Sequence, residues 1–300
     1  MRCAIVFPVG KTIVTHDGTF HADDVFAVAT LLLLEPTAAV VRTRDENIGA
    51  VADVAVDVGG VYDETRNRFD HHQIGGAGAR ENGVPYAAFG LVWRRSGTTL
   101  AGDADSAARV DALLVTPIDA SDNGVDLVVP ADTDLSSYTI ADAVRAFNPT
   151  WLEKEADRDT AFSEAVAFAQ KIISREVKRA QATCAGAAQV ERAYAASGDK
   201  RLVILDEDFS WKDILAKRPE PLYVVHPQNG TWRLYSVRDN PHLFVNRKDL
   251  PETWAGLRDA ELTRVTGVRD AVFCHRNRFM AVAKSKEGAI ALAKLALESK

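Results

Sequence analysis

Two short stretches, at 15–24 and 69–73, concentrate histidine and aspartate, the side chains that bind metal ions and move protons. A single histidine between a strand and a helix is more often structural, or a helix cap, than a ligand. The first stretch, THDGTFHADD at 15–24, is too dense for that interpretation alone. Its histidines and aspartates are His16, Asp17, His21, Asp23 and Asp24.

The second and third clusters place carboxylates beside a turn and beside a histidine pair. Asp57 interrupts the β-branched run VAVDVGG at 54–60, and burial of an isolated carboxylate is costly, so it should be paired or metal-bound. The alternative is an aspartate that only caps the turn. The run FDHHQ at 69–73 sets Asp70 before His71 and His72. Imidazole and carboxylate together suit Mn, Fe, Co or Zn, and a carboxylate can orient a ligating imidazole.

The fourth cluster, IDASDNG at 118–124, carries Asp119 and Asp122 three positions apart, which places both on one face of a helix. Taken alone, this cluster indicates the end of a helix at Asn123-Gly124. The four clusters together supply enough ligands for two metal ions that share a carboxylate. Such a pair stabilises both the attacking and the leaving oxygen in phosphoryl displacement.

The first 130 residues alternate short β-rich runs with helical patterns, which predicts βα units and a parallel sheet. This places His16 at the carboxyl end of a strand, where open α/β sheets bind ligands. The predicted strands are 4–7, 12–15, 40–43 and 54–58. The predicted helices are 23–34, 86–95 and 106–115.

A proline-free segment from Glu155 to Tyr194 repeats apolar residues at steps of three and four, which predicts one long amphipathic helix. Beyond it, strands at 202–205, 222–225, 232–237, 271–274 and 279–282 and a helix at 286–297 predict an α+β domain. The predicted architecture is therefore α/β with two domains. Its parts are an N-terminal domain at 1–150, a connecting helix at 151–198 and a smaller C-terminal domain at 199–300.

These motifs resemble, in order, those of the DHH phosphoesterase superfamily. Several runs are similar to the melanocyte proliferating gene (Myg) family: THDGTFHADD, VRTRD, DVGGVYD, FDHHQ, IDASDNG, FNPTW, WRLYSV, LPETWAGLRDAEL and KSKEGAIALA. The similarity covers nearly the whole chain. It implies a DHH-type α/β/α N-terminal domain followed by a substrate-binding cap domain.

The resemblance also implies a dinuclear site, typically manganese, with Mg²⁺, Co²⁺ or Zn²⁺ as alternatives. His16, His21 and Asp57 would hold one ion, and Asp57 would bridge to a second ion held by Asp23, His71 and either Asp119 or Asp122. His72 would contact substrate phosphate, and Asp70 would support the histidines. The chain departs from the family at Asp17 and Asp24, where Asn and Glu are common, and the superfamily usually has aspartate at the position of His21.

Anion-binding groups are expected in the C-terminal part. The turn VFCHRNR brings together His275, Arg276 and Arg278, and the run KSKEG opens the last helix with Lys284, Ser285 and Lys286. Free amides at a helix start favour phosphate. The alternative is an exposed basic turn and an ordinary cap. Trp211, Trp232 and Trp254 are candidates either for base stacking or for the core.

Charge is divided unevenly along the 300 residues. Residues 1–200 carry 19 basic and 29 acidic side chains, a net of −10, whereas residues 201–300 carry 17 and 13, a net of +4. An overall charge of −6 disfavours binding along long duplexes, which needs a broad basic surface. An acidic metal-binding half and a basic anion-binding half fit this division.

Composition excludes other classes. The longest apolar run, Val25 to Leu34, is about half the length that spans a bilayer. The first residues lack a secretory signal pattern, so a cytoplasmic protein without membrane partners is expected. Three widely spaced cysteines argue against a disulfide framework. The sequence leaves the oligomeric state open, a homo-oligomer included.

The predicted function is metal-dependent phosphoester hydrolysis. The resemblance implies a 3′-to-5′ exoribonuclease acting on RNA or short oligonucleotides through a hydroxide held by two metal ions. One alternative is hydrolysis of small phosphoanhydrides or nucleotides, as in related pyrophosphatases. Another is a metal- and nucleotide-binding module without turnover.

Overall fold

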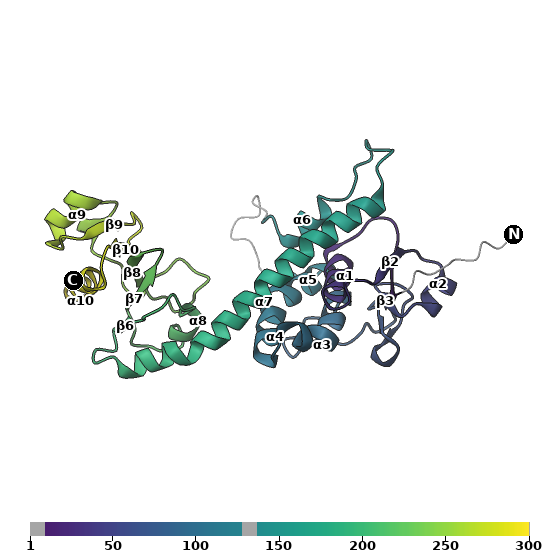
Figure 1. The fold of residues 1–300 in the computed structure, drawn as a ribbon, viewed down its shortest axis with the longest axis horizontal. Coiled ribbons are helices and arrows are strands. Elements are labelled where there is room, and N and C mark those ends of the chain that lie inside the picture. Colours follow the sequence, from purple (N-terminus) through teal and green to yellow (C-terminus); the bar gives the residue numbers. More distant parts are fainter. Residues whose placement is uncertain (1–9, 128–136, 300) are drawn as a thin grey trace. The chain divides into compact units, whose positions relative to one another are not determined.

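The computed structural model describes residues 10–127 and 137–299. The chain is an α/β protein whose described residues form two five-stranded sheets, one in each of two compact units, Met1–Gln181 and Ala182–Lys300 (Figure 1). The boundary between the units falls inside one long helix.

The first unit is built on a mostly parallel sheet in the order β2-β1-β3-β5-β4. Strand β1 pairs in parallel with β2 and with β3, and β3 pairs in parallel with β5, so these strands end at one edge. Only β4 is antiparallel to its neighbour. The strands are β1 (Thr12–Thr15), β2 (Ala39–Arg42), β3 (Val54–Val56), β4 (Tyr62–Asp63) and β5 (Arg68–Phe69).

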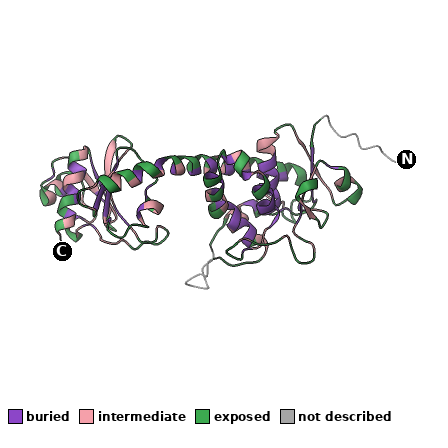
Figure 2. Cartoon of the chain, turned by 90° about the horizontal axis from the view of Figure 1, so that it is seen from below, coloured by how far each residue is buried: buried purple, intermediate pink, exposed green. Residues whose placement is uncertain are grey.

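The helices of this unit pack around a core that includes Phe20, Phe26 and Phe89 (Figure 2). Helix α1 lies against α3, and its residues from Ala22 to Leu31 are all buried, which explains the apolar run seen in the sequence. The helices are α1 (Ala22–Leu34), α2 (Glu46–Val51), η1 (Glu64–Arg66), α3 (Ala88–Ala101), α4 (Ala104–Val110), the π-helical turn η2 (Asp111–Val115), α5 (Thr116–Asp122) and α6 (Ile140–Arg145).

Helix α7 (Arg158–Ala196) confirms the predicted long helix, with its start shifted three residues. It begins after Asp157, whose carboxylate accepts from the Asp159 amide and the Thr160 hydroxyl. Its apolar face packs Phe162 and Ile173 into the core of the first unit, whereas its last turns pack into the second. The predicted role of 151–198 as a separate connecting segment stays a prediction.

The second unit is an α+β fold with the strand order β6-β7-β8-β10-β9. Strand β6 is parallel to β7, and the remaining pairs are antiparallel. Helix α10 packs on this sheet through Leu292 and Ala293. The elements are β6 (Leu202–Ile204), α8 (Lys212–Leu215), β7 (Tyr223–Gln228), β8 (Thr231–Ser236), η3 (Glu252–Trp254), α9 (Asp259–Thr266), β9 (Ala271–Cys274), β10 (Met280–Ala283) and α10 (Lys286–Glu298).

The predicted elements differ from the structure mainly at their ends. The predicted strand at 4–7 lies outside the described residues. The predicted helix at 106–115 is α4 followed by a π-helical turn, and α3 starts later and runs six residues further than the sequence indicates.

Within the ranges 10–127 and 137–299, no helix combines the length and apolarity needed to cross a bilayer. Cys184 and Cys274 are free thiols.

Candidate metal centre

The histidine and aspartate clusters meet at one edge of the first sheet. His16 directly follows β1, Asp57 directly follows β3, and His71 comes two residues after β5. Because these strands are parallel neighbours, their carboxyl ends lie side by side. The start of α1 adds Asp23, and the end of α5 adds Asp122, whose carboxylate lies 3.2 Å from the His71 ring.

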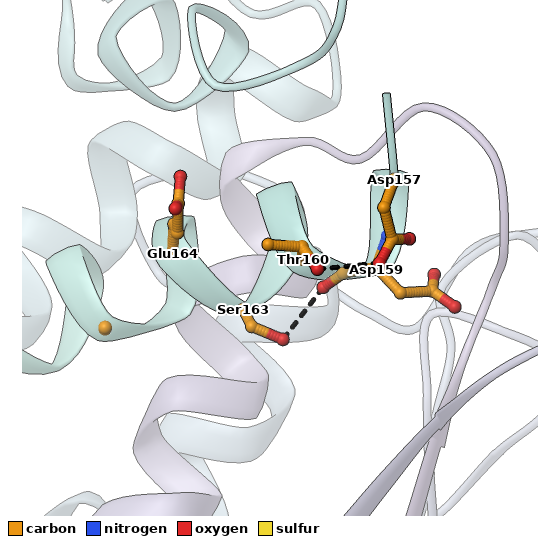
Figure 3. Close-up of a pocket in the computed structure, with 6 residues that line it drawn as sticks. Asp157, Asp159, Thr160, Ser163 and Glu164 are labelled. Atoms are coloured by element: carbon orange, nitrogen blue, oxygen red, sulfur yellow. Dashed lines mark hydrogen bonds between the residues drawn. The ribbon is translucent and has the colours of Figure 1, made fainter. Parts of the chain in front are cut away.

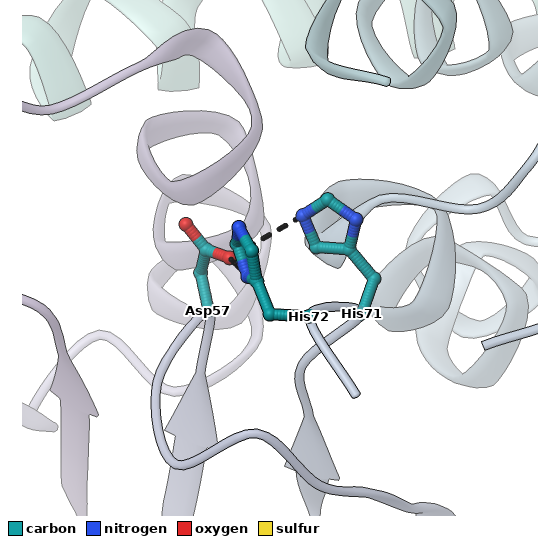
Figure 4. A group of neighbouring side chains, drawn as sticks. All are labelled: Asp57, His71 and His72. Atoms are coloured by element: carbon teal, nitrogen blue, oxygen red, sulfur yellow. Dashed lines mark ion pairs between the residues drawn. The ribbon is translucent and has the colours of Figure 1, made fainter. Parts of the chain in front are cut away.

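Asp57 lies at the centre of this group. Its Oδ2 is 3.3 Å from His16 Nε2, while its Oδ1 is 3.5 Å from His71 Nε2 and 3.2 Å from His72 Nδ1 (Figure 4). The residue has a left-handed backbone, with φ at +53°, which is strained for a side chain other than glycine but is tolerated best by Asn and Asp. This turn points the carboxylate between the imidazoles, so each oxygen faces a different group.

The two adjacent histidines differ in exposure and partners. His71 is buried, and its Nε2 also lies 3.8 Å from Asp23. His72 is 63% exposed, and its Nδ1 lies 2.9 Å from the buried Asp70, which also accepts from the His72 and Gly60 amides. With Nδ1 held between carboxylates, His72 presents its opposite nitrogen to solvent. Asp70 therefore holds the His72 ring in place.

When the imidazoles are neutral, several acceptor atoms of the cluster face one another. His16 Nδ1 lies 2.9 Å from the Asp17 carbonyl, so donation there leaves Nε2 as a lone pair facing Asp24 and Asp57, each at 3.3 Å. Both oxygens of the fully buried Asp23 lack a hydrogen-bond partner among the described residues. A cation among these acceptors resolves both problems, so the residues fit divalent metal ions.

The electrostatics of the metal-free cluster agree with this interpretation. Burial and the charges of Asp57 and Asp122 raise the pKa of Asp23 well above its usual range. Burial lowers the pKa of His71, but its pairing with Asp122 and Asp57 raises it to about 10. Pairing with Asp57 raises the pKa of His72 to about 9, against the effect of burial. Protons on these imidazoles thus balance carboxylate charge that metal ions would otherwise balance.

The alternatives Asp119 and Asp122, left open by the sequence, occupy different environments. Asp119 is fully buried away from the histidines, and its carboxylate accepts from Arg80 at 2.7 Å and from the Gly90 amide at 2.9 Å. Arg80 also binds Asp111 through two nitrogens, at 2.8 and 3.0 Å. Asp119 thus holds α5 against α3, and Asp122, one turn later, is the carboxylate that reaches His71.

His21 lies close to both groups of potential ligands. Its ligand atoms lie within 4.8 Å of those of Asp23 and Asp122, and its ring centroid lies 6.1 Å from that of His16. Asp24 takes the place beside His16, a role that sequence reasoning did not assign to it. Asp17 is exposed and pairs with Arg44 at 3.3 Å.

Arg80 and Asp24 are the residues that sequence reasoning missed. A lone arginine after a glycine-rich stretch carries no signal of its own, and only tertiary contact joins it to Asp119. Asp24 did carry a signal in the sequence. It follows Asp23 at the start of a helix, where a single carboxylate is enough to cap the helix, so the second carboxylate indicates another role. Its Oδ1 accepts from the His21 and Val25 amides, while its Oδ2 faces His16.

The basic residues predicted to bind substrate lie in the second unit, mostly with partners. Arg278 pairs with Asp249 at 3.0 Å, and Lys286 pairs with Asp206 at 2.7 Å. Ser285 caps α10, and its amide donates to Asp270. The remaining candidates are the half-buried His275 and the exposed Arg276 and Lys284. Their contact with substrate stays a prediction.

A second group of carboxylates lines a hollow at the start of α7, where Asp157, Asp159, Thr160 and Ser163 already have partners (Figure 3). Thr160 donates to Asp157 at 2.6 Å, and Ser163 donates to the Asp159 carbonyl at 2.8 Å. The Asp159 carboxylate pairs with Arg42 at 2.9 Å. This hollow is explained by helix capping and one ion pair.

Comparison with known proteins agrees with the geometry. Residues 12–297 match the MYG1_exonuc family model, described as "Uncharacterised protein family (UPF0160)". The MYG1 exonucleases of Rattus norvegicus and Homo sapiens are each 31% identical to the chain, over 94% of its length and over 84% and 85% of theirs. The MYG1 protein of Saccharomyces cerevisiae is 30% identical over 96% of both chains. The chain therefore belongs to the MYG1 exonuclease family.

Proposed function

We propose that this protein is a metal-dependent phosphodiesterase that removes nucleotides from the 3′ end of RNA or short oligonucleotides. One observation carries the proposal: three parallel strands and the start of α1 bring imidazoles and buried carboxylates to a single edge of a sheet, and both oxygens of one carboxylate, Asp23, lack a hydrogen-bond partner among the described residues. Nuclease chemistry is supported by the family, since the rat and human relatives are named exonucleases. The 3′-to-5′ direction and the preference for RNA are parts of the proposal.

In this proposal, the cluster holds two divalent ions, with Mn²⁺ as the first candidate. His16, Asp24 and Asp57 would hold one ion, and Asp57, His71, Asp23, Asp122 and His21 would supply the ligands of the other. The two Asp57 oxygens already face different imidazoles, as a bridging carboxylate requires. When bound, the ions supply Lewis acidity and lower the pKa of water at the site.

The remaining residues position the substrate. His72, with Nδ1 held by Asp70 and Asp57, is placed to donate from Nε2 to a phosphate oxygen. Its raised pKa, about 9, keeps the ring protonated at neutral pH in the metal-free protein. Asp119 and Arg80 do not contact the substrate, but they hold α5 so that Asp122 keeps its place. Arg276 and Lys284 would contribute to phosphate neutralisation from the second unit.

The test is hydrolysis of oligoribonucleotides by the full chain, with either Mn²⁺ or EDTA. We expect a ladder of 5′-labelled products that shortens from the 3′ end, only with metal, and slower cleavage of the matching DNA. A 3′-phosphate should block the reaction. Release of phosphate from pyrophosphate without any RNA cleavage would instead support the anhydride hydrolase. Metal binding without any turnover would support the binding module.

A further inference from the structure

A cavity of about 260 Å³ lies in the second unit, whereas the proposed metal ligands belong to the first unit. It is formed by α8, β8, the loop after β8 and the residue before β10. Aromatic rings, cations and a hydroxyl line it, contributed by Trp211, Lys212, Tyr235, Ser236, Arg238, Pro241, Phe244 and Phe279.

Aromatic rings line much of the cavity. Tyr235 and Phe279 are stacked with ring centroids 6.3 Å apart and an interplanar angle of 27°. His226, which is buried, supports Tyr235 from within at 5.5 Å and 12°. Phe244 completes the rim and is 86% exposed, although a large aromatic side chain is costly to leave in water. A planar ligand would cover these rings.

The cavity also carries positive charge. The Arg238 guanidinium lies 4.7 Å from the Phe244 ring centroid and 5.7 Å from that of Phe279, and its Nε donates to the neutral Asn246. The Lys212 ammonium lies 5.8 Å from the Tyr235 ring. In the part of the chain that the structure describes, neither cation forms an ion pair with a carboxylate. An anionic ligand would provide that partner.

Ser236 gives an independent indication of a ligand. The residue lines the cavity and is 4% exposed, and its Oγ has no hydrogen-bond partner among the described residues. Buried hydroxyls are rarely left unpaired, because each lost hydrogen bond is costly. The Oγ can both donate and accept, which suits the polar edge of a heterocyclic base.

We propose that this cavity binds one nucleotide, with its base on the Tyr235–Phe279 surface and its phosphate at Arg238 and Lys212. Aromatic surfaces next to cations are typical of single-stranded nucleic-acid sites, where a base stacks and the backbone is neutralised. The volume is smaller than the roughly 300 Å³ at which sites for drug-sized ligands begin, which limits the occupant to a single base. As an assignment of substrate recognition, the proposal rests on the function proposed above.

The experiment separates this site from the metal centre by working in EDTA. Calorimetry of the full chain should detect binding of AMP or UMP, weaker binding of adenosine, and no binding of inorganic phosphate alone. Phe244→Leu and Arg238→Ala should each weaken AMP binding about tenfold. The exposure of Phe244 makes its variant safe for folding, which circular dichroism will verify.

Arg258 and Phe273 provide the matched controls, because they form an arginine-over-phenylalanine pair at 4.3 Å outside the cavity. Arg258→Ala and Phe273→Leu should leave AMP binding unchanged. If the cavity variants bind AMP as the full chain does, or if phosphate binds as tightly as AMP, the proposed site is wrong.

Hydrolysis then tests the link to function. With Mn²⁺, Phe244→Leu should raise KM for an oligoribonucleotide about tenfold and leave KM for an abasic oligomer of the same length unchanged. An unchanged KM for both oligomers would overturn the assignment to substrate recognition. AMP binding in EDTA, with no hydrolysis of any substrate, would refute the proposed function while supporting the nucleotide site.

Discussion

Asp57 connects the two groups of the metal centre, because its oxygens face His16 on one side and His71 and His72 on the other. We expect Asp57→Asn to lower kcat by more than about 100-fold, since even residues behind the ligands commonly cost 10- to 100-fold. Asparagine also tolerates the left-handed backbone, so the turn should persist. Metal stoichiometry and turnover are measured on the same samples.

The same variant has an effect on stability with a defined sign. Burial raises the pKa of Asp57, but its three imidazole partners hold the pKa well below the usual range. A lowered carboxyl pKa contributes stability above the unfolded pKa of about 4. The metal-free variant should therefore be less stable at pH 7, by about 3 kcal/mol. Asp17→Asn, at an exposed aspartate, is the control; normal turnover with two ions bound in Asp57→Asn would refute the bridging role.

His71 and His72 are adjacent in sequence but are predicted to act differently. His71→Ala should reduce metal binding, because its buried Nε2 lies among Asp23, Asp57 and Asp122. His72→Ala should keep both ions and lose kcat, because its ring is exposed and held by Asp70. Calorimetric titration with Mn²⁺ distinguishes them. Equal loss of metal would make His72 a ligand as well, which its place beside Asp57 and His71 permits.

Metal binding should release protons. In the metal-free protein, the pKa of His71 is raised to about 10 and that of His72 to about 9, so both rings are protonated at pH 7. An imidazole must lose its proton to ligate, so affinity for Mn²⁺ should rise by up to about tenfold per pH unit from pH 7 to 9 for each proton released. Titrations in buffers of different ionisation enthalpy count these protons. A pH-independent affinity would contradict the ligand role of His71.

At the scale of elements, the contact between α3 and α5 sets the position of Asp122. A Cβ on Gly90 would lie 1.8 Å from Asp119 Oδ2 and 2.9 Å from Arg80, so this glycine is required for the close approach of the two helices. We expect Gly90→Ala to lower the free energy of unfolding by about 3 kcal/mol, because it disrupts a buried ion pair. Urea unfolding followed by circular dichroism measures this.

Gly49→Ala is the matched control, since Gly49 lies in α2 and nothing lies within 4 Å of its added Cβ. Replacing a helical glycine by alanine there should stabilise the protein by up to about 1 kcal/mol. Gly90→Ala should also weaken Mn²⁺ binding, because α5 carries Asp122. Full stability in Gly90→Ala would show that the two helices adjust without loss.

The sequence predicted most of the sheet that carries the site, because strands with β-branched residues and long amphipathic helices have strong local signals. Strand β1 was predicted to the residue, and α7 to within three. Strands β4 and β5, two residues each, have no detectable period. Their existence depends on pairing with one another and with β3.

The candidate site shows the same division between local and tertiary information. The clusters and their order were visible in the sequence, but the choice between Asp119 and Asp122 was not. Their spacing puts both on one helix face. Only the ion pair that the distant Arg80 forms with Asp119 distinguishes the two aspartates. The grouping of His21 with Asp122 likewise depends on where α1 and α5 lie in the fold.

At the scale of the whole molecule, charge and function are expected to be divided between the units. The proposed metal ligands all lie in residues 1–200, which carry a net charge of −10, whereas residues 201–300 carry +4 and contain the aromatic cavity. A fragment of residues 1–197 keeps all of α7, whose residues Phe162 and Ile173 complete the core of the first unit. It should fold and bind Mn²⁺ with the stoichiometry of the full chain.

The fragment should nevertheless hydrolyse oligoribonucleotides with a kcat/KM about 100-fold lower, because it lacks the groups that are proposed to position and neutralise the substrate. In the full chain, Arg276→Glu with Lys284→Glu should reproduce part of this loss without changing Mn²⁺ affinity. These two cations are better choices than Arg278 and Lys286, whose reversal would break ion pairs with Asp249 and Asp206. Full activity of the fragment on oligonucleotides would show that the second unit takes no part in substrate binding, and its basic turn would then be ordinary surface.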